Sequence, residues 1–183
     1  MIRNVTVYCA SSRKLADVYQ EAATSLGRAI ALRGWGLIYG GDRAGLMGLV
    51  ADGASAAGGN VVGIIPKRMM KPGVANERCN ELVPARDMRH RKEMLEERGD
   101  ALLALPGGLG TLEEFFEVVV GRQFGFHCKP IVLLNIAGYF TPLLAMVEHG
   151  IEHQFIKAEC RELFFVAETV EQAIGYLSGC DAK

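Results

Sequence analysis

The chain has 183 residues, of which 50% are hydrophobic and 22% are charged. This composition supports a packed core in a single domain over residues 1–183 and argues against a disordered chain. The formal net charge of −1 argues against broad electrostatic binding of nucleic acid, although it leaves room for a local basic patch. We therefore expect no nucleic-acid partner.

The sequence also bears on the cellular compartment. It begins without a basic segment followed by a signal-length apolar stretch, and no segment approaches the roughly 20 apolar residues of a membrane helix. The five cysteines are scattered and odd in number, which indicates reduced thiols rather than a disulfide framework. These features predict a cytoplasmic protein that does not bind membranes.

Short apolar runs alternate with longer segments of helical periodicity. The runs predict strands at residues 5–10, 35–39, 60–65, 82–83, 101–105, 130–135 and 163–166. The segments between them predict helices at residues 17–33, 44–57, 87–98 and 111–124, followed by a mostly helical tail. The least regular stretch, residues 66–81, is predicted to be a mobile loop.

The expected strands are continuous apolar runs, which is typical of strands buried on both faces. The sequence therefore predicts an α/β fold of Rossmann-like type, a doubly wound and mostly parallel sheet with helices on both faces. Right-handed crossovers place all strand-to-helix loops at one edge of such a sheet. We expect Ser11, the pair Gly40 and Gly41, and the pair Gly107 and Gly108 to converge at that edge.

The most informative stretch is P-G-G-L-G-T-L-E-E, in which an apolar strand passes through three glycines into a helix. Gly107, Gly108 and Gly110 let the backbone approach an anion, and a helix start offers unpaired N–H groups. We interpret this stretch as a phosphate seat. Thr111 and Glu114 also match a capping box, with Glu114 in the first turn, where the helix dipole favours its ionised form. Capping alone could explain Glu114, but a turn does not need three glycines.

The helix expected to begin near residue 87 carries two cations inside its apolar stripe. Met88, Arg91, Lys92 and Leu95 share one face, at spacings of three and four residues. Burying a charge is costly unless the charge is paired. Arg91 and Lys92 therefore either extend to water over their aliphatic stems or face an anion in a cleft, and the sequence leaves both alternatives open.

A Gly-Gly turn also follows the second expected strand. Gly40 and Gly41 lie where open α/β sheets bind ligands, outside the carboxyl end of a strand. The chain contains no P-loop, no nucleophile elbow and no dinucleotide-binding fingerprint. His149 and His153 read as surface residues, because no third metal ligand is evident. We expect neither a metal nor an organic cofactor.

These motifs, in this order, resemble the Lonely Guy family of cytokinin riboside 5′-monophosphate phosphoribohydrolases, often labelled "lysine decarboxylase-like". The family hallmarks P-G-G-x-G-T-x-x-E and M-x-x-R-K stand here as residues 106–114 and 88–92. The resemblance covers nearly the whole chain. It implies a homodimer that hydrolyses the N-glycosidic bond of a nucleoside 5′-monophosphate, giving a free base and ribose 5-phosphate.

By position, the resemblance makes Arg91 and Glu114 the catalytic pair. The substrate-binding set that we expect is Lys92, Gly107, Gly108, Gly110, Thr111, Gly40, Gly41 and Ser11. The chain departs from the family pattern at four positions, namely Ala10, Asp42, Gly73 and Arg89, where the family often has glycine, glycine, glutamate and histidine. These departures leave open which base is accepted.

Two other functions fit parts of the sequence. A non-catalytic nucleotide sensor or carrier of the same fold needs the glycines and a cation, but no carboxylate facing the sugar. A pyridoxal-phosphate lysine decarboxylase needs a Schiff-base lysine, and nothing in the sequence marks one out.

The helix that follows the glycine loop is more apolar than one buried stripe requires. Its apolar residues, with those just beyond it, are Phe115, Phe116, Val118, Val119, Val120, Phe124 and Phe126. We expect part of this surface to form an isologous contact between two copies of the chain.

Overall fold

The structure is a computed structural model and describes residues 1–181. Within this range a seven-stranded sheet runs in the order β4-β3-β2-β1-β5-β6-β7, with every neighbouring pair parallel. The strands are β1 (Asn4–Tyr8), β2 (Gly36–Tyr39), β3 (Val61–Pro66), β4 (Glu81–Ala85), β5 (Ala101–Ala104), β6 (Ile131–Leu134) and β7 (Phe165–Ala167). The prediction of a Rossmann-like parallel sheet is confirmed.

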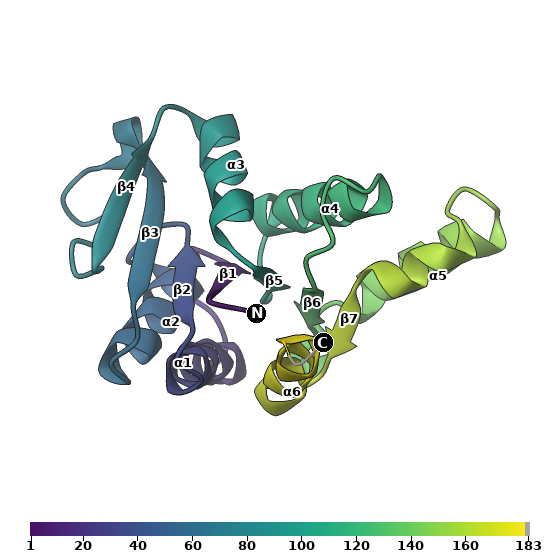
Figure 1. Ribbon diagram of the computed structural model, residues 1–183, viewed down its shortest axis with the longest axis horizontal. Helices are drawn as coiled ribbons and strands as arrows, with labels where there is room; N and C mark the ends of the chain where they lie inside the picture. Colours follow the sequence, from purple (N-terminus) through teal and green to yellow (C-terminus); the bar gives the residue numbers. More distant parts are fainter. Residues whose placement is uncertain (182–183) are drawn as a thin grey trace.

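Helices cover both faces of the sheet (Figure 1). The α-helices are α1 (Asp17–Leu32), α2 (Gly45–Ala56), α3 (Met88–Arg98), α4 (Leu109–Gln123), α5 (Thr141–Glu152) and α6 (Val170–Asp181). Short 3-10 segments lie at Lys67–Met69, Ile136–Gly138 and Ala158–Leu163. Helices α1, α2 and α6 lie on one face and α3 and α4 on the other, while α5 extends away from the sheet.

Each face of the sheet packs a core of its own. The first core includes Val7, Leu26, Ile30, Leu37, Leu46, Val50, Leu103 and Ile174. The second includes Ile38, Ile64, Leu95, Leu102, Phe115, Val118, Leu133 and Phe140. Successive residues of one strand, such as Leu102 and Leu103, therefore enter opposite cores, which is why the strand sequences are continuous apolar runs.

The strand order reverses between β1 and β5, which lie side by side. Backbone hydrogen bonds continue past the ends of both strands, because Leu105 N donates to Tyr8 O at 2.9 Å and Ala10 N to Pro106 O at 3.3 Å. The loops that follow β1 and β5 are thereby held together. Open α/β sheets bind ligands in the crevice at such a point.

Helix α4 begins earlier than the sequence pattern indicated. Gly108, in an extended conformation, is the N-cap, and Leu112 N donates the first intrahelical bond to Gly108 O at 3.1 Å. No side chain caps this helix, so the predicted capping box is wrong. Thr111 lies in the first turn and Glu114 in the second, which frees the Glu114 side chain for another role.

The irregular stretch after β3 is tied to the turn after β2. Arg43 N donates to Val74 O and Asn76 N to Gly41 O, both at 2.9 Å. An isolated antiparallel bridge also joins Asp42 to Ala75. These contacts fix the turn that carries Gly40 and Gly41 against the neighbouring loop.

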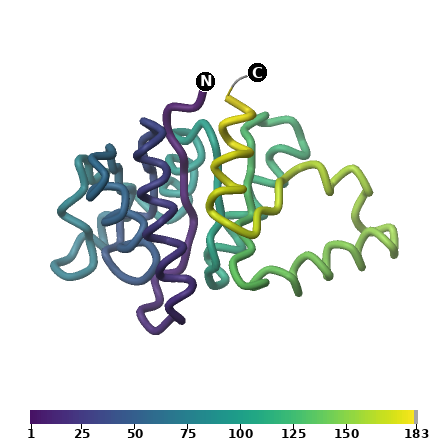
Figure 2. The backbone as a smooth tube through the Cα atoms, turned by 90° about the horizontal axis from the view of Figure 1, so that it is seen from below, coloured from purple at the N-terminus to yellow at the C-terminus, as the bar shows by residue number. Residues whose placement is uncertain are grey.

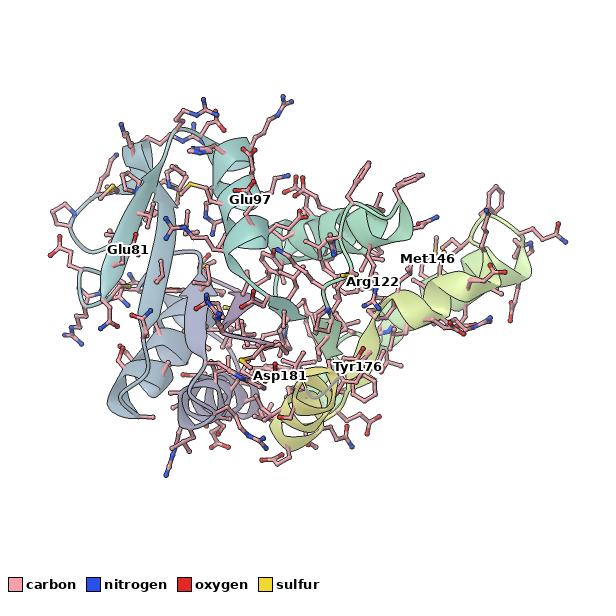
Figure 3. The ribbon with its side chains drawn as sticks, in the orientation of Figure 1. Glu81, Glu97, Arg122, Met146, Tyr176 and Asp181 are labelled. Carbon is pink, nitrogen blue, oxygen red and sulfur yellow. The ribbon has the colours of Figure 1, made fainter. Side chains whose placement is uncertain are left out.

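The two ends of the described chain lie close together (Figure 2). The Asp181 carboxylate, labelled at the end of α6 in Figure 3, accepts a hydrogen bond from Ile2 N and lies 3.7 Å from the amino group of Met1. None of the helices over residues 1–181 combines the length and apolar character that crossing a bilayer requires.

Candidate active site

A pocket with a volume of about 260 Å³ lies at the carboxyl edge of the sheet. Its walls are formed by Cys9, Ala10, Ser11, Gly40, Asp42, Met47, Pro66, Met69, Met88, Arg91, Gly108, Gly110, Thr111, Glu113 and Glu114. The loops after β1, β2, β3 and β5 all contribute to it. The predicted convergence of the strand-to-helix loops is therefore confirmed.

Arg91 and Glu114 form a buried ion pair at this pocket. Arg91 Nη1 lies 2.7 Å from Glu114 Oε1, and the two residues are only 6% and 7% exposed. Arg91 Nε donates to Ile64 O at 3.1 Å, and Nη2 lies 3.5 Å from Gly40 O. The guanidinium is therefore held by the carboxyl ends of β2 and β3. The alternative that Arg91 extends into water is wrong.

The protonation of Glu114 is set by its burial rather than by the helix start. Desolvation raises the pKa of its carboxyl above the ordinary value, and the Arg91 guanidinium opposes that rise. The expectation of a carboxylate in the first turn, ionised by the helix dipole, is wrong because Glu114 lies one turn further along. A carboxylate kept in so dry a place depends on its pairing with Arg91.

Two glycines are required by the packing of the site itself. A Cβ on Gly40 would lie 2.1 Å from Arg91 Nη2, and a Cβ on Gly107 would lie 2.1 Å from Thr111 Oγ1. Gly41 serves the turn, because its φ of +74° belongs to the left-handed region that favours glycine. Gly41 and Gly107 lie behind the pocket wall rather than in it.

Gly108 and Gly110 differ from these glycines. A Cβ on either residue would meet no protein atom within 4 Å, and neither has a positive φ. Both line the pocket. Neither packing nor a positive φ therefore requires glycine at these two positions, whereas a ligand that lies against the backbone would.

The start of α4 supplies the hydrogen-bond donors for such a ligand. The amides of Leu109, Gly110 and Thr111 precede the first intrahelical bond, which Leu112 donates. They lie at the positive end of a 15-residue helix. This arrangement suits an anion such as a phosphate.

Lys92 lies outside the pocket wall. Its ammonium is 2.6 Å from Glu113 Oε1 and 3.1 Å from Glu117 Oε2, so it joins α3 to α4. The hydrogen bond to Glu113 is the main reason that the pKa of Lys92 is raised. Ser11 and Thr111, also expected in the substrate-binding set, do line the pocket.

One wall feature of the pocket, a set of three methionines, was not predicted from the sequence. Met47, Met69 and Met88 follow β2, β3 and β4 respectively, and all three line the pocket. Methionine side chains adapt to irregular apolar surfaces. The sequence does show that each methionine follows the end of a strand. It does not show that the three lie near one another, because this depends on the order of the strands in the sheet.

Two further pocket residues carry polar groups. Cys9 directly follows β1, and its burial raises the pKa of the thiol, so the group stays neutral. Asp42 is at a position where the family often has glycine. Its Oδ1 accepts a hydrogen bond from Ala44 N at 2.8 Å, so this oxygen is bound to the backbone. His149 and His153 are exposed, as expected, and residues 1–181 hold no group of three side chains suited to a metal ion.

The family described as "Possible lysine decarboxylase" matches residues 47–177. A cytokinin riboside 5′-monophosphate phosphoribohydrolase of Rhodococcoides fascians is 43% identical over 173 residues, which cover 94% of this chain and 87% of that protein. The chain belongs to the Lonely Guy family. A probable phosphoribohydrolase of the same name from Oryza sativa subsp. japonica is 41% identical over 172 residues, or 94% of this chain and 70% of that protein.

A solved structure supports the fold independently. The molybdenum cofactor binding protein of Rippkaea orientalis superposes with a TM-score of 0.76 at 23% identity, over 99% of this chain and 98% of that chain. At this identity the likeness concerns the fold alone. The family hallmarks themselves supply the start of α4 and the Arg91–Glu114 pair.

Proposed function

We propose that this Lonely Guy protein hydrolyses the N-glycosidic bond of nucleoside 5′-monophosphates to a free base and ribose 5-phosphate. The observation that carries the proposal is a buried carboxylate, paired with Arg91, at a pocket whose wall also includes Gly108, Gly110 and Thr111 at the start of α4. Relatives at about 40% identity bear the name of this activity. A carrier or sensor would use the amides but would gain nothing from a carboxylate held at a desolvation cost.

The 5′-phosphate is assigned to the amides of Leu109, Gly110 and Thr111. These amides and the helix dipole favour a dianion, while Gly108 and Gly110 leave room for it against the backbone. Binding energy from the phosphate can then hold the ribose in position for the chemical step. Ser11, from the loop after β1, also lines the pocket and completes the proposed binding set.

Cleavage of the bond between C1′ and the base nitrogen builds positive charge on the ribose. The Glu114 carboxylate stabilises that charge and accepts a proton from the water that attacks C1′. The hydroxyl remains on ribose 5-phosphate, and the base leaves with the bonding electron pair and takes up a proton. None of these steps calls for a group beyond the protein and water.

Arg91 acts on the proposed reaction through Glu114 and directly through the pocket that it lines. Its hydrogen bonds to Ile64 O and Gly40 O fix the guanidinium, which in turn fixes one oxygen of the carboxylate. The methionine wall faces the remaining part of the ligand and suits a flat apolar base. For Lys92 to bind the substrate, as the resemblance implies, its ammonium would have to leave Glu113 and turn toward the ligand.

The direct test is incubation with AMP and with N6-isopentenyl-AMP, followed by chromatography of the base and assay of ribose 5-phosphate. We expect base and sugar phosphate in equal amounts, with no release from adenosine, which lacks the phosphate. Nucleotide binding without release would favour a sensor or carrier. The lysine decarboxylase hypothesis finds no support, because no lysine lines the pocket within residues 1–181.

Alanine variants of two glycines near the start of α4 distinguish an effect on substrate binding from an effect on folding. Gly110→Ala should leave the free energy of unfolding unchanged or raise it by about 0.5–1 kcal/mol, because alanine favours the helix. The same change should raise KM for AMP about tenfold or more, since the methyl group occupies the phosphate seat. Gly107→Ala is the matched control, which should destabilise the fold through Thr111. An unchanged KM in Gly110→Ala would show that the phosphate does not bind at the start of α4.

We further propose a cytoplasmic homodimer. Of the apolar residues on and after α4, Phe115, Val118 and Val119 are buried, whereas Phe124 and Phe126 are 67% and 82% exposed. An exposed aromatic pair of this kind suits a partner surface. Light scattering at micromolar concentration should give the mass of two chains, and Phe124→Asp should give the mass of one. A monomeric wild-type protein would contradict this proposal.

A further inference from the structure

The loops at the carboxyl edge of the sheet carry many more positive than negative side chains. Across the whole chain, 20 Lys and Arg residues balance 21 Asp and Glu residues. The four segments in question directly follow β1, β2, β3 and β4 and comprise residues 9–16, 40–44, 67–73 and 86–90, the last of which includes the first turn of α3. Their cations are Arg13, Lys14, Arg43, Lys67, Arg68, Lys71, Arg86 and Arg89, against only two acids, Asp42 and Asp87.

Both acids are already engaged by the backbone. Asp42 Oδ1 accepts from Ala44 N at 2.8 Å, and Asp87 Oδ1 accepts from His90 N at 2.9 Å as the N-cap of α3. Among the ion pairs of residues 1–181, none involves any of the eight cations. These loops therefore form a positively charged rim on a chain whose net charge is close to zero.

Part of this rim lines a groove that shares one residue, Met88, with the proposed active site. The groove is formed by Arg68, Arg86, Asp87, Met88 and Arg89. Met88 lines the active-site pocket as well, and Arg68 directly precedes Met69, which also lines it. The three arginines are exposed. An anion in the groove would thus lie next to the pocket, at the start of α3.

We propose that Arg68, Arg86 and Arg89 form an outer anion subsite that captures the phosphate dianion of the nucleotide substrate before it reaches the amides of α4. The inference rests on the proposed function. Cations that line a cleft raise the local concentration of an anionic ligand. One guanidinium group can also donate two parallel hydrogen bonds to two oxygens of a phosphate. Because the reacting groups lie elsewhere, the subsite acts on KM and leaves kcat unchanged.

The test compares Arg68→Gln/Arg89→Gln with Arg28→Gln/Arg33→Gln, a control of equal charge change at exposed residues of α1 and its C-terminus. KM and kcat for AMP are measured from about 0.01 M to about 0.15 M salt, over which the screening length falls from about 30 to about 8 Å. We expect KM to rise about three- to tenfold at low salt in the groove variant, with less salt dependence and the same kcat. The control should match the wild type.

A groove variant with the wild-type KM and the wild-type salt dependence would overturn the subsite. So would a short single-stranded oligonucleotide that binds the wild type more tightly than AMP and loses this affinity in the groove variant, since that result marks a nucleic-acid surface. If the wild type releases no base, the proposed function fails on its own. Calorimetry of AMP binding to the same variants then still decides the subsite.

Discussion

Glu114→Gln should reduce kcat for base release by about 10²–10⁴-fold, the range seen when a general base or a charge-stabilising group is removed. Glutamine keeps the shape of the side chain and can accept a hydrogen bond from Arg91 Nη1, but it carries no charge and takes up no proton. The phosphate seat at the start of α4 is untouched. The variant should therefore fold and bind AMP with an affinity close to that of the wild type.

Glu117→Gln is the matched control, because it makes the same chemical change on the same helix at a residue outside the pocket. It should retain wild-type kcat. Circular dichroism and AMP titration establish folding and binding for both variants. Normal turnover by Glu114→Gln would reduce Glu114 to a structural partner of Arg91.

The pH profile of the wild type provides a second check on the same carboxyl. Burial raises the pKa of Glu114 above the ordinary glutamate value of about 4.3, and the ionised form is the active one. Activity should therefore be lost as pH falls through this raised pKa and be restored as pH rises through it. If kcat/KM instead keeps its neutral-pH value until the pH falls to about 4, the acting carboxylate lies in a solvated position.

Arg91→Ala should affect stability and turnover together. It leaves the Glu114 carboxylate buried without its partner, and removal of one member of a buried ion pair typically costs about 3–5 kcal/mol. It also frees the carboxylate to move and removes the guanidinium from the pocket wall. We expect a lower midpoint of urea unfolding, a higher KM for AMP and a lower kcat.

A double variant separates the two effects. Adding Glu114→Gln to Arg91→Ala removes the unpaired charge, so the free energy of unfolding should recover part of the loss while turnover stays absent. Arg98→Ala is the control on the same helix, where the ion pair with Glu81 is exposed and contributes little. Wild-type stability and kinetics in Arg91→Ala would mean that the pair is not required for fold or reaction.

The sequence predicts the fold well because each element is locally consistent. The apolar strands alternate with helices, and the Gly-Gly turns after β2 and β5 mark the edge where the loops meet. Asp87 is the N-cap of α3, a position that aspartate favours. Right-handed crossovers then bring Ser11, Gly40 and Gly108 to one pocket.

The start of α4 could not be predicted as well. Thr111 and Glu114 satisfy a capping pattern by spacing, but Gly108 adopts the extended N-cap conformation and starts the helix one turn earlier. Nothing in the local sequence distinguishes the two starts, because glycine is also accepted at N-caps. The distinction matters, since it moves Glu114 from a cap into a dry pocket wall.

Side-chain partners that lie far apart in the chain were also beyond sequence reasoning. Lys92 shares a helical face with Arg91 by periodicity, yet it pairs with Glu113 and Glu117 rather than facing the pocket. The methionine wall and the basic rim each draw on several separate loops. Their grouping depends on strand order and loop course, which single segments do not encode.

A crystal structure of the Glu114→Gln variant with bound AMP would show where the nucleotide lies. We expect the 5′-phosphate within hydrogen-bond distance of the amides of Leu109, Gly110 and Thr111. We also expect C1′ of the ribose against the carboxamide introduced at position 114, with Arg91 still bonded to Ile64 O. A phosphate bound away from the start of α4, or a ribose remote from position 114, would rule out the proposed mode of binding.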